Sequence, residues 1–409
     1  MQDSEPTISI SQPEEQEFRR YVNLSIEWNR WLLKPIGAWP HSLNISWIEK
    51  CFTWLVHVVC YGLISFIFIP CTLHTILDVE DTYNKIKSFG PLSFCVMNFI
   101  KYYSLIFHVN DIRKCIKYIE WDWRNIKHVE DRSIMVANAN FAKRLVKFCT
   151  FFVGGSFVFY HIVVPINVGK VVDENLTFIP MVWPCSRLIV DTRHSPVNEI
   201  FLSIQVLAGL VIHTIAAGTC GLIAAFSVHV CGQIKVLMCW IRYLVDGRSD
   251  MCKTVDGRIA SIVCHHVRIL KCVALIEKTT TQISLVEVSG STLGICLLGY
   301  YIIMEWKAND LAASATYSVI LVSYLFNIFI FCYIGELVAE LCRSIGEMSY
   351  TIEWYRLPRR RRPGVILIIA MSNATMKLTA GGMIKLCFTS FSDVVKTSVA
   401  FLNMLRTLA

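Results

Sequence analysis

Ile200–Ile234, IFLSIQVLAGLVIHTIAAGTCGLIAAFSVHVCGQI, runs for 35 residues without Asp, Glu, Lys or Arg. A helix rises about 1.5 Å per residue, so one of this length exceeds the roughly 30 Å of hydrocarbon in a bilayer. We therefore expect a membrane-spanning helix that tilts or projects into water at one end. This stretch indicates that the fold is built in lipid.

Six other stretches of the chain are also long and apolar enough to span a bilayer. They are 51–77, 88–110, 148–169, 279–304, 311–335 and 386–405. The apolar segment 365–376 has only twelve residues, so we expect a buried or interfacial helix there. The composition, 54% hydrophobic and 17% charged, argues against a water-soluble enzyme and against disorder. The predicted fold is an all-α membrane protein with seven transmembrane helices.

The distribution of basic residues predicts the orientation of these spans. Segments 1–50, 109–147, 231–278 and 338–385 together hold thirty of the 39 Lys and Arg residues, and the alternate segments hold seven. Because cytoplasmic loops retain Lys and Arg, the N-terminus is predicted to be cytoplasmic and the C-terminus extracellular. This is the reverse of a rhodopsin-like G-protein-coupled receptor.

The same topology predicts the domain organisation and one modified residue. We expect a cytoplasmic N-terminal segment at 1–50, transmembrane helices one to six with cytoplasmic extensions at 51–337, and a cytoplasmic helix plus helix seven at 338–409. Helix-compatible sequence such as 259–278 would let spans four to six continue as a cytoplasmic bundle. Of the four N-x-S/T acceptors, only Asn175 falls in a segment assigned outside, so it alone is predicted to be glycosylated.

A search for catalytic or metal-binding sets finds none of the established motifs. His265 and His266 are adjacent, and neighbours on a helix point about 100° apart, so they cannot chelate one metal side by side. The 17 cysteines contain no two-residue spacing typical of zinc or redox sites. The basic run 359–362 is expected to anchor the chain at anionic lipid. We expect no enzyme activity, metal or cofactor, and no nucleic-acid partner.

Charged residues within predicted spans are costly in lipid and are therefore functional candidates. Lys101 could snorkel to the interface or meet a carboxylate, for which Glu287 is one possible partner. Asp393 and Lys396 are three residues apart and could pair on one helical face or line an ion path. Both alternatives stay open from the sequence.

The third span offers one face of aromatic, small and hydroxyl side chains at helical spacing. Such a face suits a concave apolar pocket with few polar groups. Close helix packing through Gly154 and Gly155 is the alternative. The residues on this face are Phe152, Gly155, Ser156, Phe159 and Tyr160.

Several short motifs spread along the chain resemble those of the insect odorant receptor family. The C-terminal part carries MKLTAGG at 376–382, FSDVVKTS at 391–398 and LRTL at 405–408. Upstream pieces agree with it: WNRWLLKPIGAWP at 28–40, EWDW at 120–123, GELV at 335–338 and EWYRLP at 353–358.

This resemblance implies an odorant-gated, non-selective cation channel in the plasma membrane of sensory neurons. It implies a heterotetramer with the odorant-receptor co-receptor, and a small volatile ligand held in the outer half of the spans. By position, Tyr317 matches an aromatic pocket residue, Met404 and Leu408 match hydrophobic gate residues, and Thr407 a polar pore neighbour. The chain lacks the co-receptor's long insertion before span five, so the resemblance is to the tuning subunit.

Three other classes of membrane protein compete with this interpretation. A gustatory receptor would share the architecture, but the dispersed motifs favour the odorant type. A G-protein-coupled receptor requires the opposite orientation. A secondary transporter should show internal repeats and broken helices near the midplane, which the sequence lacks.

Overall fold

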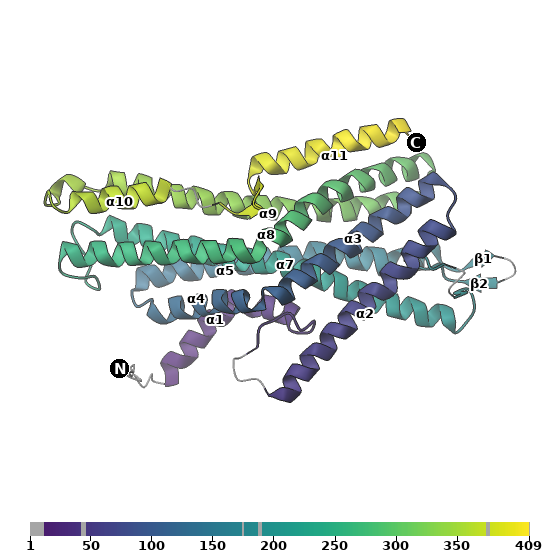
Figure 1. The fold of residues 1–409 in the computed structure, drawn as a ribbon, viewed down its shortest axis with the longest axis horizontal. Coiled ribbons are helices and arrows are strands. Elements are labelled where there is room, and N and C mark those ends of the chain that lie inside the picture. The colour runs from purple at the N-terminus through teal and green to yellow at the C-terminus, as the bar shows by residue number, and fades with distance from the viewer. Residues whose placement is uncertain (1–11, 42–45, 174–175, 187–189, 374–376, 409) are drawn as a thin grey trace.

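The computed structural model describes residues 12–41, 46–173, 176–186, 190–373 and 377–408. Helices dominate the chain, as predicted (Figure 1). They are α1 (Gln12–Leu33), α2 (Trp47–Leu77), α3 (Thr82–Phe107), α4 (Val109–Asn125), α5 (Val129–Val158), the π-helical turn η1 (Phe159–Val163), α6 (Val164–Val168), α7 (Val197–Arg242), α8 (Val255–Lys307), α9 (Leu311–Thr351), the 3₁₀ turn η2 (Trp354–Arg356), α10 (Arg362–Asn373) and α11 (Phe388–Leu408).

Two antiparallel hairpins interrupt the helices. One pairs β1 (Val171–Asp173) with β2 (Leu176–Phe178), and the other pairs β3 (Thr379–Ala380) with β4 (Ile384–Lys385).

The seven predicted spans fall one each in α2, α3, α5, α7, α8, α9 and α11, which confirms the predicted fold class. Among the described residues, five helices are long and apolar enough to cross a membrane, and α3 adds a sixth only when it is counted together with α4, from which it is bent by 65°. Helix α11 is less apolar because its 21 residues include Asp393, Lys396 and Arg406. The segment 365–376 contributes to α10, which has only 12 residues.

Helix α7 is the centre of the bundle and contacts α5, α9, α8, α1, α2 and α3. Every residue from Ile215 to Ile234 is buried. Its glycines allow this close approach, because a Cβ at Gly218 would lie 2.5 Å from Leu33 and one at Gly221 would lie 2.5 Å from Asn29. The stretch that most resembles a lipid-facing helix is therefore enclosed by protein.

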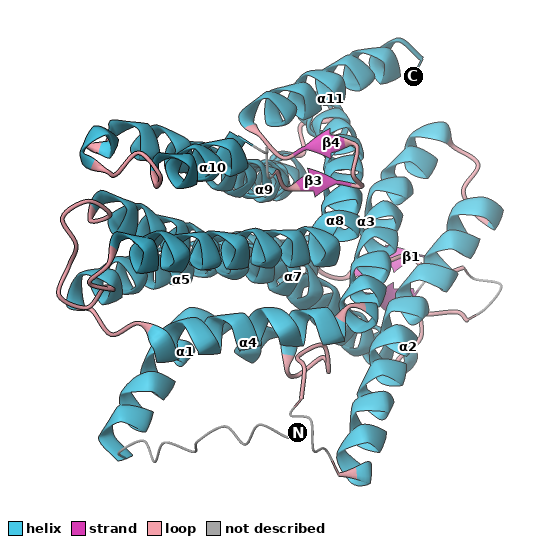
Figure 2. Ribbon diagram, turned by 60° about the vertical axis from the view of Figure 1, so that its left-hand side comes forward, coloured by secondary structure: helices cyan, strands magenta, loops and turns pink. Residues whose placement is uncertain are grey.

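Beyond the spans, α7, α8 and α9 continue into one end of the molecule, where α10 packs along α9 (Figures 1 and 2). We call this end the helical extension: residues 109–147, 235–278 and 336–373. The predicted continuation of spans four to six as a helical bundle is confirmed in its geometry. Buried polar contacts hold it together: Arg248 pairs with Asp131 at 2.6 Å, and Trp240 Nε1 donates to the same carboxylate at 2.8 Å.

Two ionisable groups of the extension have displaced pKa values. Asp111 on α4 accepts from Lys114 and Lys278, each at 2.9 Å, and the hydrogen bond from Lys114 is the main cause that lowers the pKa of Asp111 to about 2. Burial lowers the pKa of His265 to about 4, where its ring lies 4.8 Å from that of Trp240. Asp111 is thus a carboxylate and His265 a neutral imidazole near pH 7.

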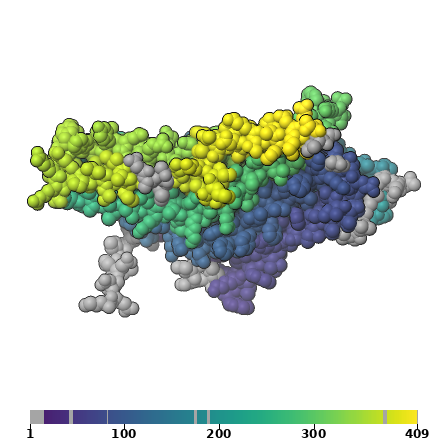
Figure 3. Space-filling view, turned by 45° about the horizontal axis from the view of Figure 1, so that its top comes forward, coloured from purple at the N-terminus to yellow at the C-terminus, as the bar shows by residue number. Residues whose placement is uncertain are grey.

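The β3–β4 hairpin explains the MKLTAGG motif. Gly381 and Gly382 have φ of +64° and +71°, a conformation that glycine adopts without steric cost. The Gly381 amide donates to Thr281 O at 3.0 Å, and the Thr379 amide donates to Glu277 at 2.9 Å, so the hairpin is fixed to α8. This fixes the start of α11, which then lies along the surface of the bundle (Figure 3).

Candidate ligand cavity

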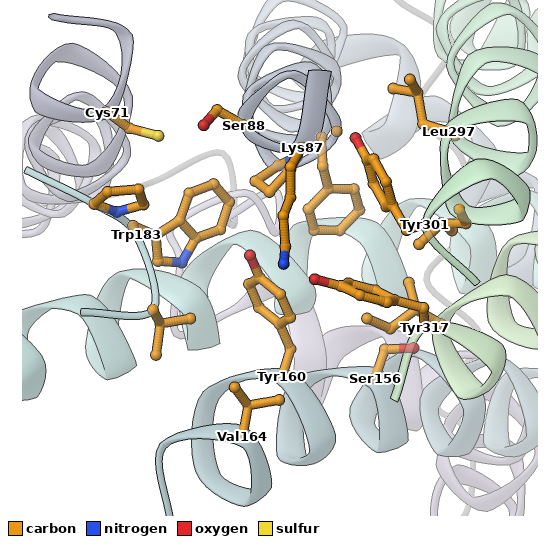
Figure 4. A pocket seen from close by; sticks show the side chains of 18 of the residues that line it. Cys71, Lys87, Ser88, Ser156, Tyr160, Val164, Trp183, Leu297, Tyr301 and Tyr317 are labelled. Atoms are coloured by element: carbon orange, nitrogen blue, oxygen red, sulfur yellow. The ribbon is translucent and has the colours of Figure 1, made fainter. Parts of the chain in front are cut away.

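A cavity of about 710 Å³ lies among α3, α5, η1, α7, α8 and α9, within the range of small-molecule sites. Aromatic and aliphatic side chains form much of its wall, together with polar and charged side chains that include Asp81, Lys87, Lys101, Glu287 and Asp310. Figure 4 shows the hydroxyls of Tyr160 and Tyr317 pointing toward each other from different helices. Its aromatic lining consists of Phe94, Tyr160, Trp183, Tyr301, Tyr317 and Tyr324.

The π-helical turn η1 positions one wall of the cavity. A π turn inserts one extra residue into a helix, so it shifts the faces that precede and follow it. Ser156 before the turn and Tyr160 within it both line the cavity, while His161 is turned inward and buried. The Ser156 hydroxyl lies 2.6 Å from that of Ser323 on α9, which in turn donates to Phe152 O at 2.8 Å.

Trp183 covers the cavity from the segment that follows the β1–β2 hairpin. Its backbone amide donates to Gln205 Oε1 at 3.2 Å, and its carbonyl accepts from Gln205 Nε2 at 2.7 Å. Its indole Nε1 donates to His161 Nε2 at 3.1 Å. These contacts hold a side chain that is 2% exposed, although no regular element carries it.

A basic side chain projects into the cavity from α3. Lys87 points between the hydroxyls of Tyr160 and Tyr317 in Figure 4, and its ammonium lies 6.0 Å from the Tyr317 ring centroid. Glu305 accepts from Lys87 at 2.7 Å and from the Tyr83 hydroxyl at 2.9 Å. This ion pair ties α3 to α8 beside the cavity.

Two buried charges and an amide also line the cavity, and we call them the polar floor: Lys101, Glu287 and Asn327. Lys101 Nζ forms an ion pair with Glu287 Oε2, with the two side chains 1% and 2% exposed. Asn327 Nδ2 and the Ser291 hydroxyl both donate to Glu287 Oε1. The proposed partnership of Lys101 with Glu287 is therefore confirmed, and it joins α3, α8 and α9.

The structure brings some residues of the predicted span-three face to the cavity and leaves others away from it. Ser156, Tyr160 and the separately predicted Tyr317 line it. Phe152 instead stacks on Phe326 at 4.1 Å, and Phe159 is 36% exposed.

Gly155 does not line the cavity, and a Cβ at Gly154 or Gly155 would meet no atom within 4 Å. The alternative of close helix packing through these glycines is therefore wrong for this chain.

The residues predicted in the last span lie on an exposed face of α11, which no other element covers within the part of the chain that the structure describes. Asp393, Met404 and Thr407 are exposed there, and Met404 is 58% exposed. Lys396 is also exposed, and the described residues contain no ion pair between it and Asp393. Asn175 and the side chain of Leu408 fall outside the described residues.

Sequence reasoning missed several lining residues because they carry no motif. Trp183 stands between Pro180 and Pro184 in the sequence PMVWP, and this unusual apolar run between two predicted spans was the available signal. Tyr301 and Tyr324 resemble ordinary residues of a membrane span, and they line the cavity because of the way α8 and α9 are oriented about their axes. Within the described residues, no group of three or more His, Cys, Asp or Glu could hold a metal ion.

The sequence of this chain is similar to those of known membrane receptors. Residues 84–399 match the sequence profile described as 7tm Odorant receptor. Odorant receptor 10 of Aedes albopictus is 24% identical over 252 residues, which cover 58% of this chain and 65% of that receptor. Odorant receptor 83a of Drosophila melanogaster is 24% identical over 151 residues, 36% of this chain and 33% of the receptor. The chain thus matches one third to just under two thirds of these relatives' lengths.

A solved structure extends the likeness over nearly the whole chain. The olfactory receptor OR5 from Machilis hrabei, in complex with eugenol, superimposes with a TM-score of 0.74 at 15% identity, covering 97% of this chain and 99% of that one. At this identity the likeness shows a shared fold. The profile match spans well over half of the sequence, so the chain belongs to the odorant receptor family.

Proposed function

We propose that this chain is the odorant-binding subunit of a ligand-gated cation channel. The observation that carries the proposal is the tyrosine-lined cavity of about 710 Å³ in the transmembrane bundle of an odorant receptor family member. A related insect receptor of the same fold is in complex with eugenol. An apolar volatile would gain affinity from burial, at about 25 cal/mol per Å² of apolar surface.

The proposed orientation has the N-terminus and helical extension in the cytoplasm and the C-terminus outside. The thirty basic residues in alternate segments support it. In this orientation the cavity lies in the outer half of the bundle, and Asn175 is the predicted glycosylation site. An epitope after Ala409 should stain on intact cells; staining only after detergent would contradict the orientation.

The proposed pore is lined by α11 in a heterotetramer with the odorant-receptor co-receptor, in the plasma membrane of sensory neurons. Support comes from the exposed face of α11, where Met404 and Thr407 have no partner element within the described part of the chain. Met404 and Leu408 would form a hydrophobic constriction that blocks ions by dewetting. Asp393 and Lys396 would be candidates to contact permeating ions.

Gating follows from differential affinity. A ligand opens the channel only by binding the open state more tightly than the closed state. The polar floor and the Lys87–Glu305 pair connect the cavity wall to α8. Helix α8 in turn contacts α11, where the Ser398 hydroxyl donates to Thr292 O at 2.9 Å. Movement of α8 is the proposed route from cavity to pore.

Current recording tests the proposal in three arms: this subunit alone, the co-receptor alone, and both together. We expect odorant-evoked cation current only from the pair. Tyr317→Ala should weaken the response by removing a cavity wall, and Phe159→Ala, outside the cavity, serves as the control. A full response from this chain without a partner would contradict the subunit assignment.

A further inference from the structure

The orientation of the Asn327 amide is fixed by its neighbours. Glu287 forms an ion pair with Lys101 and is therefore a carboxylate, which can only accept hydrogen bonds. Asn327 must turn its Nδ2 toward that carboxylate, because its Oδ1 would be repelled there. The amide oxygen consequently points away from Glu287.

This amide oxygen lacks a hydrogen-bond partner among the described residues. Asn327 is only 9% exposed and lines the cavity. A buried carbonyl oxygen without a donor costs about 1–3 kcal/mol, so the site favours any molecule that supplies one. The charge of Glu287 on the opposite side of the amide polarises it and strengthens the oxygen as an acceptor.

Several other polar groups that line the cavity either have partners already or can donate as well as accept. The Ser156 and Ser323 hydroxyls already bond to each other and to Phe152 O. A tyrosine hydroxyl, such as that of Tyr160 or Tyr324, can donate or accept and therefore suits either kind of ligand. Among the described buried side-chain atoms that lack a hydrogen-bond partner, Asn327 Oδ1 is the one whose residue lines the cavity, so a ligand donor placed there makes an otherwise missing hydrogen bond.

We propose that Asn327 is a specificity-determining residue and that the ligands are small apolar molecules bearing a hydroxyl group, such as alcohols or phenols. The hydroxyl donates to Asn327 Oδ1 at the polar floor, and the apolar part occupies the aromatic remainder of the cavity. A site built to bond a hydroxyl rejects an analogue without one, because its polar group is then left unpaired. The inference rests on the proposed function, since it assumes that the cavity binds odorants.

The test compares two isomers of equal size, 1-octanol and 1-methoxyheptane, of which only the alcohol can donate. Their affinities are measured on the purified full chain in nanodiscs, by displacement of an apolar fluorescent probe. We expect 1-octanol to bind about tenfold more tightly than the ether to the unmodified chain. In Asn327→Leu the ratio should fall to about one.

Asn98 provides a matched control. It is 0% exposed, its Oδ1 also lacks a partner, and its Nδ2 donates to Phe94 O at 2.8 Å, but it does not line the cavity. Asn98→Leu should leave the alcohol-to-ether ratio unchanged. Should Asn327→Leu not fold, equal affinities of the two isomers for the unmodified chain would still overturn the inference.

Three results would overturn the inference. Equal affinity of the isomers for the unmodified chain would mean that water satisfies the Asn327 oxygen, with odorant binding intact. Retention of the tenfold ratio in Asn327→Leu would assign discrimination to another group. Failure of both isomers to displace the probe would overturn the inference together with the proposed binding role of the cavity.

Discussion

The buried Lys101–Glu287 pair predicts a stability pattern that depends on which partner is removed. Three variants of the full chain are compared: Lys101→Met, Glu287→Gln, and both together. Methionine keeps most of the lysine volume without charge. Glutamine keeps an oxygen that can accept from Asn327 and Ser291, which both donate to Glu287 in the unmodified chain.

The magnitude follows from burial. With side chains 1% and 2% exposed, either single variant leaves one charge inside the bundle without its partner. Removing one member of a buried pair costs about 3–5 kcal/mol. The group left without its partner could instead become neutral, which caps the loss of stability at a similar value. At pH 7 an ordinary carboxyl costs about 4 kcal/mol to protonate and an ordinary ammonium about 5 kcal/mol to deprotonate. The double variant leaves no orphan charge, so we expect it to lose less than about 2 kcal/mol.

The assay is thermal unfolding of the detergent-purified chain followed by fluorescence-detected size exclusion. Lys87→Met is the comparison, because its pair with Glu305 leaves the lysine 39% and the carboxylate 10% exposed, so we expect a smaller loss than for Lys101→Met. The double variant should be more stable than either single variant. A double variant destabilised by the sum of the two single effects would refute the reasoning.

Three further perturbations test the cavity and the extension. Gly209→Ala should lower ligand affinity at least tenfold, because the new Cβ would overlap His161. Gly154→Ala is its control, since a Cβ there meets no atom within 4 Å. Equal affinities of the two variants would argue against a role for the Gly209–His161 contact. Trp183→Phe removes the donor to His161 and should raise the ligand dissociation rate severalfold in stopped-flow measurements, unless the loop is held by its backbone alone. The pKa of His265 is depressed to about 4 in the folded chain, so as the pH falls the unfolded chain binds a proton at this residue first. The free energy of unfolding should therefore fall as the pH drops from about 6.5 to 4. His265→Phe should flatten that pH dependence, and an unchanged dependence would exclude His265 as its source.

The sequence was sufficient for the helices because hydropathy and the absence of charge act locally. The continuous α8 follows from its apolar and helix-compatible segments. Tyr160 and Ser156 could be anticipated from helical spacing, but Phe159 could not be excluded, because η1 changes the periodicity just there.

The remainder of the site depends on relations between distant residues. Asn327 reaches the cavity because α9 rotates it toward Glu287, forty positions earlier in the chain. Trp183 reaches it because Gln205 anchors a loop that has no periodicity to interpret. Spacing rules operate within one helix, so contacts between helices lie beyond them.

The most apolar stretches of helices α2 and α7 are equally hydrophobic, yet 17% of that stretch is buried within the protein in α2 and 50% in α7. Lipid is a fluid that conforms to any apolar shape, whereas neighbouring helices do not. A saturation mutagenesis map should therefore show α2 accepting almost any apolar side chain and α7 rejecting most changes of volume. Two helices of equal hydrophobicity would then differ in how many substitutions each can accumulate during evolution.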